Sequence, residues 1–316
     1  MYWATLSRPI PLTELGWANA IYLGNGSSGS DPMMVWGTTV DMDPVDDFVK
    51  GHSGRTGLIL SPAHLLVKAV AASLFEHPKV NCRVIGRRVY RYDGVNVVVP
   101  MLRGRSGEAE TVFLHRADKM SLAEIAQRFW CEARDMASQA ARDERERRNA
   151  GRDHPTGLGL ARRLKLWWLR RMSWLGFAVA NRLRFPTIWP WQQELNGANA
   201  LVNYLGFAGA PPLICFKPSC LPMNSYSVNV TLGPAEPRPV VLDGAIVIRR
   251  QAPLFVRADH RMVNAHEAAA FINTLRAHLA DPRSLITADE QSIDGAIDPA
   301  SRSLDRTPQP VELTRA

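Results

Sequence analysis

The residue types best suited to chemistry gather in the stretch RADHRMVNAHEAAAF, at positions 257–271. His260 follows an apolar, strand-like run and precedes a predicted helix, and such a corner presents a side chain on a rigid support. An imidazole titrates near neutral pH and can carry a proton during a reaction. On these residues alone two interpretations stay open. Either His260 is a general base, or its nitrogens are satisfied by Asp259 or by the backbone.

Two elements must position that histidine. The β-rich run at 254–258 predicts a strand that ends next to His260. A helix is predicted over 264–280, because Asn264 is a good N-cap and Glu267 completes the spacing of a capping box. The apolar residues of this helix recur at helical spacing and predict one buried face, namely Ala268, Phe271, Ile272, Leu275 and Leu279.

The rest of the chain alternates between helix-like and strand-like patterns. One helix is predicted to open at Ser61-Pro62, since serine can cap backbone N–H groups and proline is tolerated at the first helical position. Another is predicted over 121–141 from a capping-box pattern. Asp93-Gly94 stands between two β-rich runs, which is a strong hairpin signal. Strands are predicted at 33–42, 84–92, 95–102, 111–115, 201–205, 225–232 and 239–248.

Composition sets broad limits on the class of protein. The chain has 316 residues, of which 46% are apolar and 22% charged, as expected for a globular protein with a large core. Its formal charge of +8 could attract nucleic acid, anionic lipid or a polyphosphate such as coenzyme A, and it selects none of them. The four cysteines form no C-x-x-C pair, so neither a metal site nor a disulfide framework is predicted. With no signal-peptide pattern and no run of about 20 apolar residues, a cytoplasmic protein is expected.

Five segments resemble, in the correct order, the acyltransferase catalytic domain of 2-oxo acid dehydrogenase complexes and, more distantly, chloramphenicol acetyltransferase. The C-terminal signature of that superfamily is a histidine, three residues and then Asp-Gly, and the stretch DHRMVNA resembles it. Each motif alone is weak, but several in order are fairly specific. The segments lie at 61–84, 92–102, 117–129, 196–206 and 258–282.

The resemblance implies an α/β two-layer sandwich: the mixed sheet of the chloramphenicol acetyltransferase fold with packed helices, plus a helical insertion. It implies a catalytic domain over 1–286, with a basic, tryptophan-rich insertion at 142–193, followed by a flexible tail at 287–316. The family assembles as homotrimers with active sites between subunits, so a homotrimer or a larger assembly is expected. Coenzyme A or acyl-coenzyme A is the implied substrate. No lipoyl group is expected on this chain, so a separate lipoyl-type carrier protein is the expected partner.

The same resemblance assigns roles to residues. His260 would be the general base that takes a proton from a thiol, whose pKa of about 8.5 lets neutral imidazole generate thiolate. In the family the thiolate attacks a thioester carbonyl, and a hydroxyl of the neighbouring subunit stabilises the oxyanion. Asn203 occupies the place of that hydroxyl and its amide can donate a hydrogen bond. The alternative is that Asn203 is a plain strand residue and the donor is lost. The implied function is a coenzyme A-dependent acyltransferase acting between a thioester and a thiol or another nucleophile.

Departures from the family pattern keep a second function open. Asn264-Ala265 stands in place of the family's Asp-Gly, and asparagine keeps the capping oxygen that would hold the His260 loop but loses the charge. The N-terminal arginine that pairs with this aspartate in the family falls at Gly16. The alternative function is a catalytically weak homologue that serves as a trimeric scaffold or partner-binding module.

The segment 158–185 interleaves clustered basic residues with tryptophan and other bulky apolar residues. Three interpretations stay open: an interfacial helix in peripheral contact with a membrane, a lid that binds coenzyme A, and a helical hairpin packed on the trimer or on another chain. No nucleic-acid-binding motif accompanies the charge, so no nucleic acid partner is expected. The tryptophans are Trp167, Trp168 and Trp174, and the basic residues are Arg162, Arg163, Lys165, Arg170, Arg171, Arg182 and Arg184.

Overall fold

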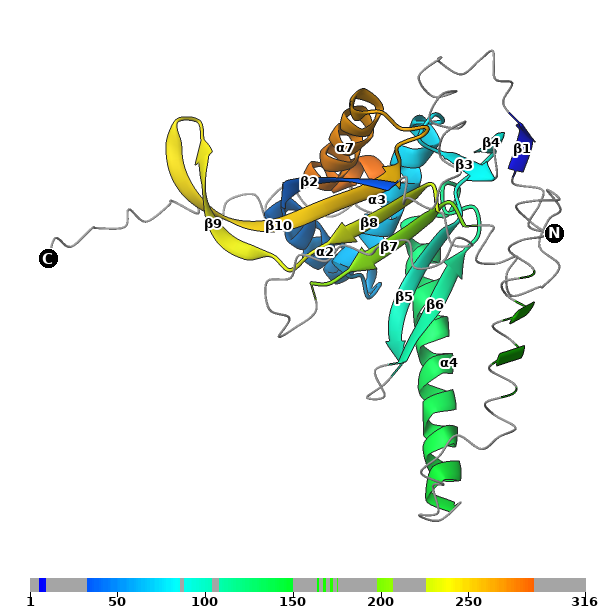
Figure 1. Cartoon of the computed structure of the whole chain (residues 1–316). Helices are drawn as coiled ribbons and strands as arrows, with labels where there is room; N and C mark the ends of the chain where they lie inside the picture. The colour runs from blue at the N-terminus through cyan, green and yellow to red at the C-terminus, as the bar shows by residue number, and fades with distance from the viewer. Residues whose placement is uncertain are drawn as a thin grey trace, which may run out of the picture.

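The chain folds around one large mixed sheet, seen in the computed structural model of the protein (Figure 1). The structure describes residues 6–9, 33–85, 88–103, 108–149, 198–206 and 226–286, and six positions between 164 and 175. In chain order the elements are β1 (Leu6–Pro9), β2 (Met33–Asp41), α2 (Asp43–Thr56), α3 (Pro62–Glu76), β3 (Cys82–Ile85), β4 (Arg88–Tyr92), β5 (Val97–Arg103), β6 (Glu108–Leu114), α4 (Leu122–Asn149), β7 (Ala200–Tyr204), β8 (Val228–Leu232), β9 (Glu236–Leu242), β10 (Ala245–Asp259), α7 (Ala265–Ala280) and the 3-10 helix η3 (Pro282–Leu285).

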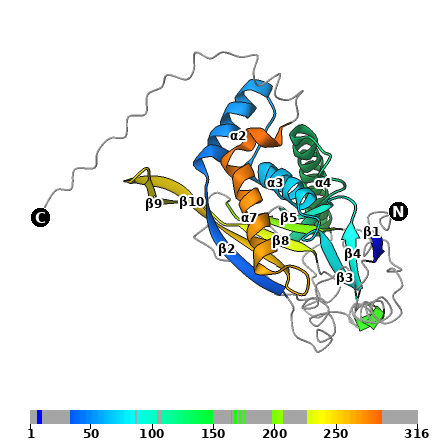
Figure 2. The same ribbon diagram turned by 90° about the horizontal axis from the view of Figure 1, so that it is seen from above.

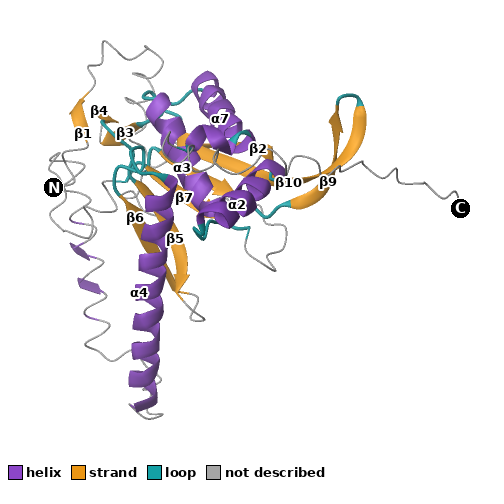
Figure 3. Ribbon diagram, turned by 180° about the vertical axis from the view of Figure 1, so that it is seen from behind, coloured by secondary structure: helices purple, strands orange, loops and turns teal. Residues whose placement is uncertain are grey.

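The seven-stranded sheet has the order β2-β10-β8-β7-β5-β6, with β9 paired to the first half of β10. Strand β7 runs parallel to both β5 and β8, whereas the other neighbouring pairs are antiparallel. Helices α2, α3, α4 and α7 lie on one face of this sheet, as the views from above and from behind show (Figures 2 and 3). The predicted mixed sheet with packed helices is therefore confirmed.

The sheet face beneath the helices forms the hydrophobic core. Side chains on β8 and β10 alternate between the core and the opposite face, as the two-residue period of a strand requires. The opposite face carries polar side chains, which matter for the candidate site described below. On the core side both strands are buried and apolar, with Val228, Val230, Leu232, Leu254, Val256 and Ala258.

Asp93-Gly94 does not form the predicted hairpin. Strand β4 belongs to a separate three-stranded sheet of order β1-β4-β3, whereas β5 lies inside the main sheet. A type I′ turn requires positive φ at both central residues, and neither Asp93 nor Gly94 has one. Gly94 instead permits a close approach, because a Cβ there would lie 2.4 Å from Nε of Arg116. The predicted strand at 84–92 is likewise wrong in extent, since β3 and β4 are two strands that pair with each other.

A hairpin does form at another Asp-Gly pair. Asp243 and Gly244 have φ angles of 51° and 79°, and they join β9 to β10. The prediction of a single strand at 239–248 is wrong, because that range spans the turn. The hairpin curves away from the body of the molecule (Figure 1), and β10 continues for 15 residues to Asp259. One strand therefore runs from the projecting hairpin to the predicted histidine corner.

The helices predicted from capping residues begin where expected, with α3 after Ser61, α4 after Ser121 and α7 after Asn264. Helix α4 runs past the predicted end at 141 as far as Asn149, so the first part of the predicted insertion continues this helix. The sequence does not predict α2, because the residue before it is Met42, whose side chain makes no capping hydrogen bond.

Several expectations concern residues outside the described part of the chain. Gly16, Cys215, Cys220 and the predicted tail at 287–316 all lie there. Within the described part, no helix has the length and apolar character to cross a membrane, and no group of three potential metal ligands is found.

Candidate active site

The corner at the end of β10 fixes the tautomer of His260. The backbone turns sharply after Asp259, whose carbonyl accepts hydrogen bonds from the N–H groups of Met262 at 3.0 Å and Val263 at 2.9 Å. This turn brings the Val263 carbonyl within 3.0 Å of His260 Nδ1. A carbonyl can only accept, so Nδ1 carries the proton and the lone pair of the neutral ring lies on Nε2. Since His260 is only partly buried, its ring is not sealed inside the core.

The Asp259 carboxylate holds Arg261. Arg261 Nε donates to both carboxylate oxygens at 2.9 and 3.1 Å, and the Arg261 backbone N–H donates to one of them at 3.0 Å. Such a two-pronged contact fixes side-chain and backbone geometry together. Of the two partners that the sequence left open for His260, the backbone supplies the contact at Nδ1. Asp259 contributes by making the corner rigid.

Trp36 flanks the histidine from the neighbouring strand. Strand β2 pairs antiparallel with β10, with Trp36 opposite Val256. The Trp36 and His260 rings meet edge to face, with centroids 6.3 Å apart and an interplanar angle of 63°. Sequence reasoning missed this residue, because the contact depends on the register of two strands more than 200 positions apart.

Asn264 caps helix α7 directly after the histidine corner. Its side-chain oxygen accepts from the Glu267 N–H at 3.0 Å, and the Glu267 carboxylate accepts from the Asn264 N–H at 3.0 Å. The predicted capping box is confirmed. The capping oxygen thus anchors the helix that follows the His260 turn.

Asn203 lies far from His260 within one protomer. It sits on β7 opposite Thr231 of β8, which in turn is opposite Phe255 of β10. Phe255 precedes His260 by five residues, which is about 17 Å along a strand, and β7 is two strands away, or about 10 Å. The Asn203 amide donates to Thr231 Oγ1 at 3.4 Å. A single protomer therefore does not bring these two predicted site residues together.

A polar row lies between them on the sheet face opposite the helices. Asn229 stands opposite Arg257 in the β8–β10 register, and Ser227 lies just before the start of β8. Asn229 Oδ1 and Ser227 Oγ are buried and have no hydrogen-bond partner among the described residues. Buried polar atoms are normally paired, so these two oxygens are suited to accept from a bound group. The alternation of polar residues in the stretch SVNVT is the sequence signal that could have found them.

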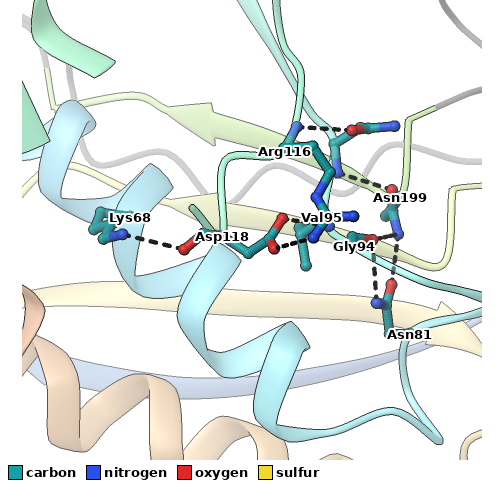
Figure 4. Close-up of polar contacts among 8 residues, drawn as sticks. Lys68, Asn81, Gly94, Val95, Arg116, Asp118 and Asn199 are labelled. Atoms are coloured by element: carbon teal, nitrogen blue, oxygen red, sulfur yellow. Dashed lines mark hydrogen bonds and ion pairs between the residues drawn. The ribbon is translucent and has the colours of Figure 1, made fainter. Parts of the chain in front are cut away.

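A buried asparagine network fixes the start of the strand that carries Asn203 (Figure 4). Asn199 Nδ2 donates to Asn81 Oδ1 at 2.6 Å and to the Gly94 carbonyl at 2.8 Å. The Asn96 N–H donates to Asn199 Oδ1 at 2.9 Å. Because all three asparagines are buried, this network ties the starts of β5 and β7 to the residue before β3 and so fixes the start of the strand that carries Asn203.

Other titratable groups near the core are poor candidates for chemistry. Burial lowers the pKa of His64 to about 4, and its Nδ1 accepts from the Ser61 N–H at 3.1 Å, so it stays neutral at neutral pH. Burial raises the pKa of the Cys82 thiol to about 11, which keeps it protonated and unreactive. Both groups serve packing, whereas His260 stands at the edge of the core.

Comparison with known proteins matches the C-terminal part of the chain to a family. A sequence model of 2-oxoacid dehydrogenases acyltransferase (catalytic domain) matches residues 217–287. The match contains His260 and Asn264 and leaves Asn203 outside. The resemblance drawn from the sequence motifs is thereby confirmed.

Two curated proteins are similar to the chain. The dihydrolipoyllysine-residue succinyltransferase component of the 2-oxoglutarate dehydrogenase complex of Haemophilus influenzae is 24% identical over 295 residues, which cover 90% of this chain and 57% of that protein. The lipoamide acyltransferase component of the branched-chain alpha-keto acid dehydrogenase complex of Pseudomonas putida is 34% identical over 95 residues, which cover 30% of this chain and 21% of that protein. The chain thus spans little more than half of the first relative and about a fifth of the second.

Among solved structures, the cubic core of the pyruvate dehydrogenase multienzyme complex has the same fold. It matches with a TM-score of 0.54 at 19% identity, over 88% of this chain and 93% of that chain. The similarity confirms the fold, because so low an identity carries no information about individual residues.

Proposed function

We propose that this chain is a coenzyme A-dependent acyltransferase of the kind found in 2-oxo acid dehydrogenase complexes, with His260 as its general base. The observation that carries the proposal is the 3.0 Å contact between His260 Nδ1 and the Val263 carbonyl. It directs the lone pair to Nε2 at a position that corresponds to the histidine of the family signature. A base with a fixed tautomer on a rigid strand end is what proton abstraction from a thiol needs.

In the proposed reaction, His260 Nε2 takes the proton from the thiol of the acceptor. The resulting thiolate attacks the carbonyl carbon of the acyl thioester and forms a tetrahedral intermediate with a negatively charged oxygen. Collapse of this intermediate breaks the bond to the departing sulfur, which recovers the proton from the imidazolium. The reaction breaks one thioester and forms another of similar free energy. The enzyme therefore needs only to stabilise the oxyanion and to hold the proton.

The oxyanion donor is proposed to come from Asn203 of a neighbouring subunit. Support comes from the distance between Asn203 and His260 in one protomer, which is too great for both to act on one carbonyl. A homotrimer in which the β10 end of one subunit meets the β7 end of the next would complete the site. The relative solved as a cubic core is consistent with such an assembly.

The projecting hairpin offers a surface for this self-association. The β9–β10 register places Val241 opposite Ile246 and Pro239 opposite Ile248, so these side chains share one face. All four are exposed in the single chain. An isolated two-stranded ribbon with an exposed apolar face is marginally stable by itself, so cover by a neighbouring subunit is the proposed arrangement.

Coenzyme A and a separate lipoyl-type carrier are the proposed substrates. The pantetheine arm of coenzyme A contains amide N–H donors, and Asn229 Oδ1 and Ser227 Oγ are buried acceptors with no partner among the described residues. Asn229 lies on the same sheet face as Asn203, and in this proposal the arm runs across β8 toward the thioester. In this proposal the reacting sulfur lies near the end of β10.

Acyl transfer tests the proposal directly. With acetyl- or succinyl-coenzyme A as donor and dihydrolipoamide as acceptor, release of coenzyme A would be measured for the wild-type protein and for His260→Ala. We expect a loss of about a thousandfold in kcat, the size of a missing general base. His266→Ala is the matched control, because His266 is exposed on α7, and its activity should equal that of the wild type.

The second candidate is a scaffold of the same fold without useful catalysis. It is favoured by Asn203 in place of the family's hydroxyl and by Asn264-Ala265 in place of Asp-Gly. Equal rates of acyl transfer for wild type and His260→Ala, together with a stable trimer in sedimentation analysis, would support the scaffold function and contradict the proposed catalytic function.

A further inference from the structure

The six described positions of the segment 158–185 lie on one side of a helix. Leu164, Trp167, Trp168, Arg171, Met172 and Leu175 all have helical conformation. Their spacing of three and four residues places them on a single face. We call the five apolar members, Leu164, Trp167, Trp168, Met172 and Leu175, the tryptophan face.

Four of the five side chains of the tryptophan face are exposed to solvent in the single chain. Leu164 is 57% exposed, Trp167 56%, Trp168 50% and Leu175 48%. Apolar side chains that lie together at this exposure mark a surface that binds something. The described residues of its own subunit therefore leave most of this face uncovered.

The charge of this segment indicates the kind of partner. Residues 158–185 contain seven lysine and arginine residues and no aspartate or glutamate. The whole chain has a formal charge of +8, so 8 − 7 leaves +1 for all the remaining residues. The positive charge of the protein is thus concentrated in the segment that carries the exposed tryptophan face, and an anionic partner is favoured.

The contact between Arg171 and Trp167 shows how charge and apolar surface meet. The Arg171 guanidinium lies 5.4 Å from the centre of the Trp167 ring. An indole with a cation over its face suits the boundary between lipid tails and phosphate headgroups, where tryptophan is enriched. Nucleic acid would satisfy the arginines but would leave leucine and methionine without an apolar partner. A second copy of the same segment would bring seven positive charges together with seven more.

We propose that the tryptophan face docks in the interface of an anionic phospholipid bilayer. Its leucine, methionine and tryptophan side chains would enter the boundary between headgroups and acyl chains, Arg171 would contact a lipid phosphate, and the positive charge of 158–185 would attract the anionic surface. This inference goes beyond acyl transfer and does not depend on it. It would hold the proposed enzyme at a membrane surface.

Vesicle co-sedimentation of the full chain tests the proposal. The probes are phosphatidylcholine vesicles with and without phosphatidylglycerol. We expect binding only to the anionic vesicles, and it should weaken as salt is added, because headgroup attraction is screened. The double substitution Trp167→Ser with Trp168→Ser should lower the affinity about tenfold or more, since it removes two large apolar side chains. Arg171→Glu should lower it about fivefold or more through the loss and reversal of one charge.

Trp130→Ala is the matched control, because Trp130 is an exposed tryptophan on α4, outside the segment. It should bind vesicles like the wild type, and His260→Ala should do so as well, which separates this proposal from the catalytic one. Quenching of tryptophan fluorescence by brominated phosphatidylcholine mixed with phosphatidylglycerol should be strong in the wild type and weak in the double variant. The proposal is overturned if the wild type ignores anionic vesicles, or if the double variant binds them equally. A changed oligomeric state in the double variant without vesicle binding would identify the face as a protein–protein contact and would equally overturn it.

Discussion

The His260 corner and the Asn203 strand end are built in different ways. Around His260, the contacts that fix the ring and the next helix link residues at most three positions apart, such as His260 with Val263 and Asn264 with Glu267. Around Asn203, the contacts that fix the strand start link Asn199 to Asn81, which is 118 positions away. One half of the candidate site is therefore encoded locally, and the other half depends on the assembled sheet.

The two regions also differ in completeness. The histidine corner has its tautomer, its rigid turn and its aromatic neighbour in place within one subunit. The asparagine end has a donor whose contact in the single subunit is the long hydrogen bond to Thr231. The difference teaches that the proposed base can be recognised in a monomer, whereas the proposed oxyanion donor acquires its role only from a neighbour.

Mixing two inactive variants is the sharpest way to break this comparison. His260→Ala subunits lack the base and Asn203→Ala subunits lack the donor, so neither homotrimer has an intact site. If each site takes its base from one subunit and its donor from the next, even random mixing restores about a quarter of the sites. We expect the co-expressed mixture to regain about a quarter of wild-type activity, measured as coenzyme A release.

The control is a mixture of His260→Ala with the double variant that carries both substitutions, which should remain inactive. A mixture of the two single variants that stays inactive, although native mass spectrometry shows mixed trimers, would place both residues of each site in the same subunit.

The same contrast explains how much the sequence could predict. Helices α3, α4 and α7 begin after serine or asparagine caps, a signal that lies within a few residues, and the sequence locates all three starts. Helix α2 begins after Met42, which gives no such signal, and it is missed. The corner at His260 is encoded by a local signal in the same way as the three capped helix starts. Its position and its capping box therefore follow from nearby residue types.

Two Asp-Gly pairs show where local signals fail. Asp243-Gly244 adopts positive φ and makes a hairpin, whereas Asp93-Gly94 is followed by a strand of another sheet. The Gly94 carbonyl accepts hydrogen bonds from Asn199 and, at 3.4 Å, from Asn81. No pattern within a few residues of Asp93 contains that information. The placement of Asn203, Trp36 and Asn229 relative to His260 depends on the same kind of distant pairing.

Substitution of Asn203 tests whether the asparagine strand end contributes to catalysis as the His260 corner does. Asn203→Ala should lower kcat about a hundredfold with little change in KM, because a donor to the oxyanion acts on the transition state more than on the bound substrate. Asn203→Ser restores a hydroxyl like that of the family and should retain more activity than alanine. Steady-state kinetics with varied acyl-coenzyme A separates kcat from KM. Rates within about twofold of wild type for Asn203→Ala would make Asn203 a plain strand residue.

The smallest expected effect concerns the cap that follows the histidine corner. Asn264→Ala removes the oxygen that accepts from the Glu267 N–H, and the free energy of unfolding should fall by about 1 kcal/mol. Asn264→Asp keeps the cap and adds a negative charge at the N-terminus of α7, so stability should rise by about 0.3–1 kcal/mol at neutral pH. Urea unfolding measures both, and Asn273→Ala, an exposed position within the same helix, is the matched control.

If Asn264 only supports the corner, kcat should change by less than about tenfold in Asn264→Ala, far less than for His260→Ala. A loss as large as that of the histidine variant would mean that Asn264 touches the reacting groups, and that the locally encoded half of the site extends beyond the imidazole.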